Sequence, residues 1–168
     1  WIRESQNLKK YDFIILPGSK QTIKDQIYLE NSGLSQDIRE YANSNGNIVG
    51  ICGGLQMLGT ILEDPYSKEG SKNYSEQKTK GIGLLPLKTT FLEKKITRQI
   101  NSQSLWPCQT KINGFEIHNG QTKLDITQNT LDIKPIFKDL DLGWYKENNG
   151  GGTIDRKSTR LNSSHNQI

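Results

Sequence analysis

The pattern of apolar and polar positions predicts alternating strands and helices in the first part of the chain. Two short, nearly continuous apolar runs, 12–16 and 47–51, are typical of buried parallel strands. Between them the apolar spacing predicts a short helix capped by Ser19 and a second helix over 34–43. After the second strand, leucines recur with helical spacing through Leu62. This order of elements indicates an α/β fold with a doubly wound, mostly parallel sheet.

The pattern changes after Pro65. Residues 66–80 are polar, with almost no aliphatic side chains, and predict a surface loop. Beyond this loop only short β-like runs follow, at 84–85, 89–91, 112–117, 131–137 and 143–145. A last run at 151–154 suggests that the domain stops within a strand.

The composition is that of a single soluble domain. The chain has 168 residues, of which 32% are hydrophobic and 24% charged, well short of a disordered composition. No apolar run approaches the roughly 18 residues of a membrane span, and no signal-peptide pattern is visible, so no membrane partner is expected. Two cysteines, Cys52 and Cys108, make no disulfide framework. This usage predicts a reducing, cytoplasmic environment.

The last residues form a segment of their own. Residues 155–165 resemble the in-frame translation of a common short-read sequencing adapter. We therefore expect 155–168 to be a non-native tail and 1–154 to carry the domain. Without the tail's three cations and one anion, the formal net charge falls from +4 to +2. No basic patch with interleaved aromatics is left, so no nucleic-acid partner is expected. His165 falls in the tail, which leaves His118 as the histidine of the domain.

The segment Gly50-Ile51-Cys52-Gly53-Gly54 carries the strongest chemical signal. A cysteine between a buried strand and a helix, flanked by glycines, is typical of a nucleophile elbow, in which a sharp turn exposes the side chain. The N–H groups at the start of the helix favour the thiolate, and the N–H of Gly53 points to where an oxyanion forms during acyl transfer. The alternative is a structural cysteine at a tight turn. Cys108, within Trp106-Pro107-Cys108-Gln109, lacks the elbow pattern and is expected to be structural.

Four blocks of the sequence together resemble the glutamine amidotransferase domain of the cobyric acid synthase family, a class I glutaminase. They contain Asp-Phe-Ile-Ile-Leu-Pro-Gly-Ser-Lys, Gly-Ile-Cys-Gly-Gly-Leu-Gln-Met-Leu-Gly, Gly-Ile-Gly-Leu-Leu-Pro and Gly-Phe-Glu-Ile-His-Asn-Gly, within 12–23, 50–59, 81–91 and 114–120. Their order and spacing fit the family. The resemblance implies a flavodoxin-like α/β domain, here expected to be truncated at both ends.

The resemblance also implies a role for particular residues. In such enzymes a cysteine thiolate attacks the side-chain amide of glutamine, and a histidine passes a proton to the leaving ammonia. By position, Cys52 is the nucleophile, and Gly53 with Gly18 or Ser19 supplies the N–H groups of the oxyanion hole. Gln56 stands where the family has a glutamine-binding residue. The alternative for Gln56 is an ordinary exposed helix position.

Glu116 and His118 alternate with apolar neighbours, which places both on one face of a predicted strand. We expect them to line the site; the alternative is a hydrogen-bonded pair on a strand face. In the family the catalytic histidine follows a later Gly-Thr-Tyr motif, and 152–154 resemble the opening of that motif. We therefore expect this histidine to be missing from the chain and its glutaminase activity to be poor.

The resemblance places the remaining chemistry outside this domain. Glutamine is the substrate here, with no metal and no cofactor expected in the domain. An upstream amidoligase domain would use ATP and Mg²⁺ to activate carboxylates of adenosylcobyrinic acid a,c-diamide for amidation by the released ammonia. Three alternatives stay open. One is a sister amidotransferase, either cobyrinic acid a,c-diamide synthase or the subunit that amidates a cell-wall lipid precursor. The others are a non-catalytic α/β binding domain and a cysteine hydrolase of the same architecture.

Overall fold

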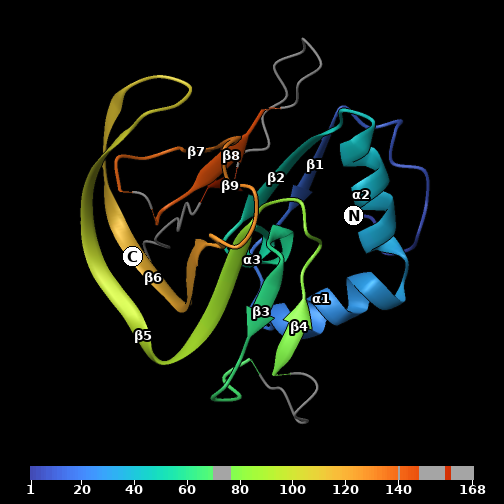
Figure 1. The fold of residues 1–168 in the computed structure, drawn as a ribbon, viewed down its shortest axis with the longest axis horizontal. Helices are drawn as coiled ribbons and strands as arrows, with labels where there is room; N and C mark the ends of the chain where they lie inside the picture. Colours follow the sequence, from blue (N-terminus) through green and yellow to red (C-terminus); the bar gives the residue numbers. More distant parts are fainter. Residues whose placement is uncertain (70–76, 140, 148–157, 160–168) are drawn as a thin grey trace, which may run out of the picture.

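The structure is a computed structural model that describes residues 1–69, 77–139, 141–147 and 158–159. The short helices and the parallel strands lie on one side, and a long two-stranded ribbon curves away on the other (Figure 1). In chain order the elements are β1 (Phe13–Leu16), α1 (Thr22–Asn31), α2 (Leu34–Asn43), β2 (Asn47–Ile51), α3 (Gly53–Leu58), β3 (Ile61–Glu63), β4 (Lys78–Lys80), β5 (Leu87–Ser104), β6 (Thr110–Leu124), β7 (Ile133–Pro135), β8 (Trp144–Lys146) and β9 (Ser158–Thr159).

The first two predicted strands and the helix between 34 and 43 are confirmed. Strands β1 and β2 pair in parallel, with Leu16 beside Gly50 at their carboxyl ends. The short helix predicted after the first strand is α1, which is ten residues long, and its N-cap residue is Gln21. The expectation that Ser19 caps this helix is wrong, because the helix begins at Thr22. The Ser19 hydroxyl instead accepts a hydrogen bond from the Gln21 N–H, at 2.9 Å, in the preceding turn.

The helix after Cys52 is shorter than its leucine spacing suggests. Helix α3 ends at Leu58, and Leu62 is a buried residue of strand β3. The chain turns at Gly59, where a Cβ would lie 2.6 Å from the Leu87 carbonyl oxygen. This close packing against the start of β5 leaves no room to continue the helix. Within the predicted loop, Lys78–Lys80 form a strand, β4, antiparallel to β3.

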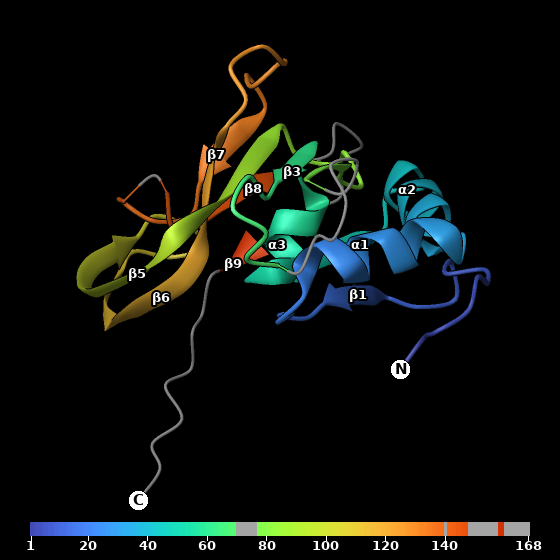
Figure 2. The ribbon, with the colours of Figure 1, turned by 90° about the horizontal axis from the view of Figure 1, so that it is seen from below.

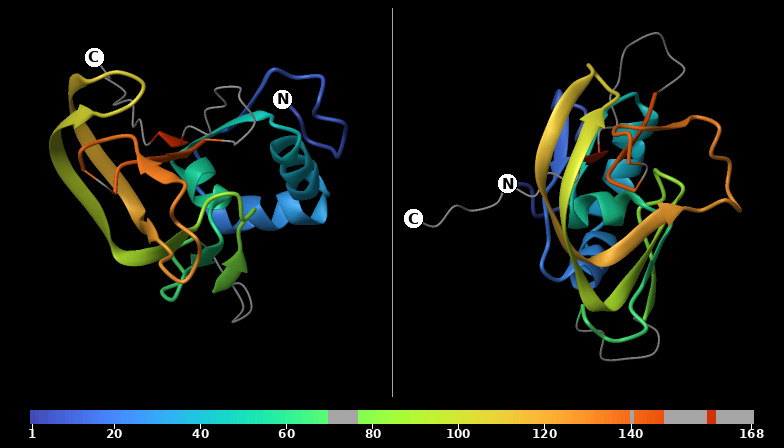
Figure 3. Two further views of the ribbon diagram at one scale, coloured as in Figure 1. Left: turned by 45° about the horizontal axis from the view of Figure 1, so that its top comes forward. Right: turned by 90° about the vertical axis from the view of Figure 1, so that its left-hand side faces the viewer.

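The strands form three sheets, in the orders β1-β2-β9, β4-β3-β5-β6 and β7-β8. The α/β class is confirmed, with parallel pairing of β1 with β2 and of β3 with β5, and antiparallel pairing of β5 with β6. Two of the predicted short β-runs, 89–91 and 112–117, belong to the continuous β5–β6 ribbon, whose curve Figures 2 and 3 show from other sides. Its register shifts between Phe91 and Ile96, which is a bulge of the kind that bends and twists a strand.

Two apolar clusters hold the elements together. The main cluster packs α1, α2 and α3 on β1, β2 and the base of β5, with Ile23, Ile48 and Leu55 fully buried. The second fills the space between the ribbon and the β7–β8 hairpin, and its buried members are Ile136, Phe137, Leu142 and Tyr145. The second cluster therefore fixes the hairpin against the inner face of the ribbon.

The end of the chain adds one short element. Strand β9 falls within the expected non-native tail, where the sequence predicted no element, and its backbone pairs in parallel with β2. The run 151–154 and the rest of the tail lie outside the described residues. Within the part of the chain that is described, no helix is long and apolar enough to cross a lipid bilayer.

Candidate active site

Cys52 occupies a strained turn between β2 and α3. Its backbone angles are φ 52° and ψ −110°, which places a non-glycine residue in a region that L-amino acids rarely adopt. Such strain costs on the order of 1–3 kcal/mol and persists only where the surrounding packing enforces it. The thiol is partly exposed, whereas a packing cysteine would be fully buried. This geometry is that of the predicted nucleophile elbow.

The glycines around Cys52 allow the backbone to approach closely. A Cβ on Gly54 would lie 2.0 Å from the Leu16 carbonyl oxygen, and one on Gly50 would lie 2.7 Å from the backbone of Gly54. Neither position has room for a side chain. The glycines thus let helix α3 begin directly against β1 and β2, which forces the sharp turn at Cys52.

The turn after β1 lies beside the elbow. Parallel pairing brings the carboxyl ends of β1 and β2 to the same edge of the sheet, where α/β proteins commonly bind ligands. A Cβ on Gly18 would be 3.6 Å from the Cβ of Cys52, and the Ser19 nitrogen lies 2.8 Å from the Cβ position of Gly53. The structure therefore brings Gly18, Ser19 and Gly53 together around Cys52, as an oxyanion hole made of backbone N–H groups requires.

A cavity of about 120 Å³ opens in front of Cys52. Glu116 and His118 line it with Cys52, and both are buried on the inner face of β6. The prediction that these two side chains share a strand face is confirmed. The other lining residues come from the ribbon and from the segment around β7–β8: Ile100, Ile112, Asn113, Gly114, Phe115, Phe137 and Leu142.

Glu116 is the electrostatic centre of this wall. Its Oε1 accepts a hydrogen bond from His118 Nε2, and its Oε2 accepts one from Arg98 Nε. Burial raises the pKa of the Glu116 carboxyl, but the hydrogen bonds from His118 and Arg98 outweigh burial, so the pKa lies below its ordinary value. The carboxylate is therefore held in its ionised form beside His118.

Gln56 lies one helical turn beyond Cys52 but is not among the residues that line this cavity. It is only 3% exposed, so the alternative of an exposed helix position is wrong. The side chain packs against the base of the ribbon, because a Cβ on Gly120 would be 2.6 Å from Gln56 Nε2. Burial of this amide against β6 is a consequence of the long ribbon, which the sequence pattern did not reveal.

Two charged residues beside the cavity, Arg98 and Asp141, were not predicted from the sequence. Arg98 pairs directly with Glu116 across the ribbon, and its Nη2 lies 2.9 Å from Asp141 Oδ2. One signal was available: in a hairpin that turns around Pro107, residues 98 and 116 are equidistant from the turn. No such signal exists for Asp141, which reaches Arg98 only through the packing of the β7–β8 hairpin.

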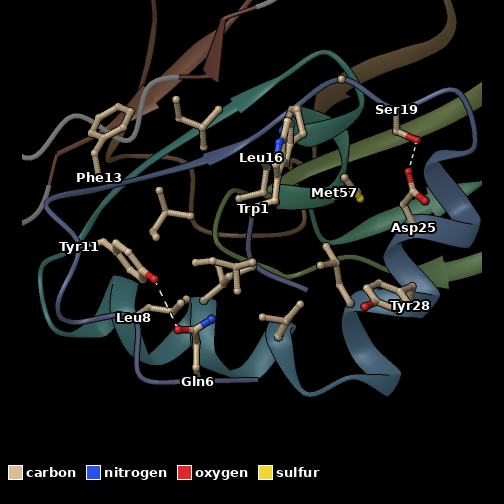
Figure 4. Close-up of a pocket in the computed structure, with 18 residues that line it drawn as sticks. Trp1, Gln6, Leu8, Tyr11, Phe13, Leu16, Ser19, Asp25, Tyr28 and Met57 are labelled. Carbon is tan, nitrogen blue, oxygen red and sulfur yellow. Dashed lines mark hydrogen bonds between the residues drawn. The ribbon is translucent and has the colours of Figure 1, made fainter. Parts of the chain in front are cut away.

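A second, larger hollow of about 500 Å³ lies between β1 and the N-terminal segment (Figure 4). Its lining is mainly apolar and comes from the N-terminal segment, β1, α1, α2 and Met57 of α3, with Leu8 and Leu16 among its residues. It meets the elbow only at the turn of Gly18 and Ser19, and it contains neither Cys52 nor Glu116. The cavity in front of Cys52 is smaller, but it holds the reactive groups.

Other sites for chemistry are few in the described residues. Cys108 is exposed at the far end of the ribbon, and its carbonyl oxygen accepts a hydrogen bond from the Ser104 hydroxyl at 2.5 Å. Among the residues described here, no group of three or more His, Cys, Asp or Glu side chains could hold a metal ion.

The fold and this cavity define an α/β domain with a cysteine nucleophile elbow, as in class I glutamine amidotransferases. The sequence matches the CobB/CobQ-like glutamine amidotransferase domain over residues 1–157, and the chain belongs to this family. A crystal structure of a glutamine amidotransferase superposes with a TM-score of 0.65 and 13% sequence identity, covering 94% of this chain and 74% of the other. That likeness supports the fold.

The curated relatives include cobyric acid synthases of Prochlorococcus marinus. The protein of strain MIT 9312 is 79% identical over 154 residues, and that of strain MIT 9301 is 80% identical over the same length. The protein of strain NATL2A is 48% identical over 147 residues. The first two alignments cover 92% of this chain but 30% of the relatives' length. The chain therefore corresponds to less than a third of those proteins.

Proposed function

We propose that residues 1–154 are the glutamine-hydrolysing unit of a cobyric acid synthase and that 155–168 are a non-native tail. The observation that carries the first part is the strained elbow at Cys52, whose thiol opens into a cavity walled by Glu116 and His118. The family membership and the names of the relatives support this assignment. The relatives align over 154 of the 168 residues, which is the length that the tail proposal leaves to the domain, while the family model matches through residue 157.

In the proposed reaction the Cys52 thiolate attacks the side-chain carbonyl carbon of glutamine. The N–H groups of Gly53 and of Gly18 or Ser19 stabilise the oxyanion that forms on the carbonyl oxygen. The carbon–nitrogen bond then breaks, ammonia leaves with a proton, and a γ-glutamyl thioester remains on Cys52. Water hydrolyses the thioester to glutamate and restores the thiol. Gln56 stays a proposed glutamine-binding residue on the family resemblance alone, because its buried side chain does not line the cavity of Cys52.

The proton for the leaving ammonia needs a donor. His118 is the one histidine in residues 1–154, and we propose that it and Glu116 line the glutamine site, while the family's acid–base histidine follows residue 154. The 168-residue chain should then release ammonia slowly, since a proton-transfer group contributes about 10²–10⁴-fold to rate. Covalent capture of Cys52 is therefore a sharper test than turnover.

For the intact protein we propose that the ammonia amidates carboxylates of adenosylcobyrinic acid a,c-diamide. Activation of these carboxylates by ATP and Mg²⁺ would take place in a domain outside this chain. The names of the relatives, and the share of their length that this chain leaves unmatched, support this proposal. The two free thiols fit a cytoplasmic location.

The test is labelling by a diazo-ketone analogue of glutamine, followed by mass spectrometry of the intact chain and of its peptides. One adduct is expected, on Cys52, with protection by glutamine and not by asparagine. The Cys52→Ser variant should stay unlabelled, and Cys108→Ser should react like the original chain. Equal labelling of both cysteines without protection by glutamine would favour a non-catalytic binding domain.

A further inference from the structure

Arg98 holds the carboxylate of Glu116 from the side opposite His118. The two residues are direct partners in the β5–β6 register, so their side chains leave the ribbon on the same face. Arg98 bonds Oε2 of the carboxylate while His118 bonds Oε1. Because each oxygen has its own donor, the carboxylate cannot rotate without losing one of these bonds.

The same guanidinium reaches a second element. Its Nη2 lies 2.9 Å from Asp141 Oδ2, in the segment between β7 and β8. That segment also supplies Phe137 and Leu142 to the cavity in front of Cys52. Arg98 therefore connects two walls of this cavity, one on the ribbon and one on the β7–β8 hairpin. The planar fork of a guanidinium can bridge two carboxylates, whereas the single ammonium of lysine cannot do so in the same geometry.

The four side chains of this network differ in burial, so their ion pairs contribute differently to its stability. The side chains of Glu116 and His118 are only 4% and 6% exposed, while those of Arg98 and Asp141 are 47% and 50% exposed. A half-exposed ion pair by itself adds little stability. A buried carboxylate that loses a cation is far more sensitive, because little water can replace the lost interaction. The main effect of Arg98 is therefore on Glu116 and, through it, on His118.

We infer that Arg98 and Asp141 are positioning residues of the glutamine site. Arg98 fixes the Glu116 carboxylate, which holds the His118 ring in the wall of the cavity that Cys52 also lines, and Asp141 fixes Arg98. Arg98 acts through Glu116 and does not contact glutamine. The inference rests on the proposed function for its catalytic meaning, but the arrangement of charges can be tested without any reaction.

The experiment compares Arg98→Met, Arg98→Lys and Asp141→Asn with the original chain, all with Cys108→Ser. The control is Arg39→Met, which removes another partly exposed arginine, whose ion pair with Glu30, at 3.0 Å, lies on the helical side of the molecule. The first readout is the NMR titration of the Glu116 carboxyl carbon. The second is the rate of Cys52 labelling by the diazo-ketone analogue at increasing concentration, which separates the limiting rate from the half-saturating concentration.

Arg98→Met should raise the titration midpoint of Glu116 by about one pH unit, as expected for the loss of an adjacent opposite charge. It should lower the limiting labelling rate about tenfold, less than the 10²–10⁴-fold of a group that itself transfers a proton. Arg98→Lys should change the midpoint and the limiting rate in the same directions but by less than Arg98→Met. Asp141→Asn should cause the smallest change of the three variants in both quantities, and Arg39→Met should match the original chain.

An unchanged midpoint together with an unchanged limiting rate in Arg98→Met would overturn the inference. So would a higher half-saturating concentration at an unchanged limiting rate, because Arg98 would then be a direct ligand of glutamine. If Arg98→Met does not fold, the midpoints and limiting rates of Arg98→Lys and Asp141→Asn test the inference in the same way. If the original chain is not labelled at all, the proposed function fails, and the Glu116 titration alone decides the role of Arg98.

Discussion

The backbone nitrogen of Ser19 lies 2.8 Å from the position that a Cβ on Gly53 would occupy. The turn after β1 and the first residue of α3 are thus in direct backbone contact, although 34 positions separate them in the sequence. Parallel pairing of β1 with β2 creates this contact, because it aligns the ends of the two strands. The same contact brings together the N–H groups proposed to bind the oxyanion.

Gly53→Ala should therefore disturb the proposed oxyanion hole more than the fold. The added methyl group would press on the Ser19 nitrogen and displace one of the two N–H donors. Loss of one such donor costs on the order of 10²–10³-fold in rate. The expected result is a limiting rate of Cys52 labelling that is lower by about a hundredfold, with a thermal unfolding midpoint that falls by less than that of Gly54→Ala, whose Cβ would lie closer to backbone. A labelling rate within twofold of the original would contradict the role of this contact.

Gly54→Ala should instead destabilise the fold. Its Cβ would lie 2.0 Å from the Leu16 carbonyl oxygen, which is backbone and cannot move aside without shifting β1. We expect a loss of about 3 kcal/mol in the free energy of unfolding, at the upper end for an overpacked site. Gly114→Ala is the matched control, because no atom lies within 4 Å of its Cβ position. Equal stability of the two variants in urea denaturation would rule out this explanation for Gly54.

Glu116 should make stability depend on acid pH. Its pKa in the folded chain lies below the ordinary value of 4.5, so its ionised form stabilises the fold above that pH. The contribution is lost as the pH falls through the lowered pKa. Glu116→Gln should be less stable than the original chain at neutral pH, with a difference that shrinks below 4.5. Urea denaturation across this range measures the effect, with the exposed Glu4→Gln as control. A difference independent of pH would show that lost packing, not charge, is responsible.

Glu69 should show the opposite dependence. Burial raises the pKa of this carboxyl, and the charges of Asp64 and Asp25 add to the increase, although the Thr22 N–H donates to its Oε2 at 2.6 Å. Its stabilising contribution is present below the ordinary pKa and is lost as the pH rises through the raised value. Glu69→Gln keeps an acceptor for Thr22 and removes the charge. Its stability relative to the original chain should therefore increase from acid to neutral pH, and a decrease over that range would refute this account.

The local pattern predicted the parts of the site that lie close together in the sequence. The apolar run at 47–51 followed by glycines around Cys52 specified a strand, a sharp turn and a helix, and the structure contains all three. Alternation along β6 placed Glu116 and His118 on one face, and both are buried there. The leucine spacing wrongly predicted a helix through Leu62, because a short apolar run fits a buried strand as well as a helix.

The sequence by itself determined the elbow at Cys52 and the strand face of Glu116 and His118, because the period of a strand and the size of glycine are local properties. Only the tertiary structure decided that Arg98 and Asp141 support this face and that Gln56 is buried against Gly120. These contacts depend on the register of a long ribbon, its bulge after Phe91 and the packing of the β7–β8 hairpin. Many contacts between residues far apart in the sequence determine these three features together, and a local pattern of residues does not reveal such contacts.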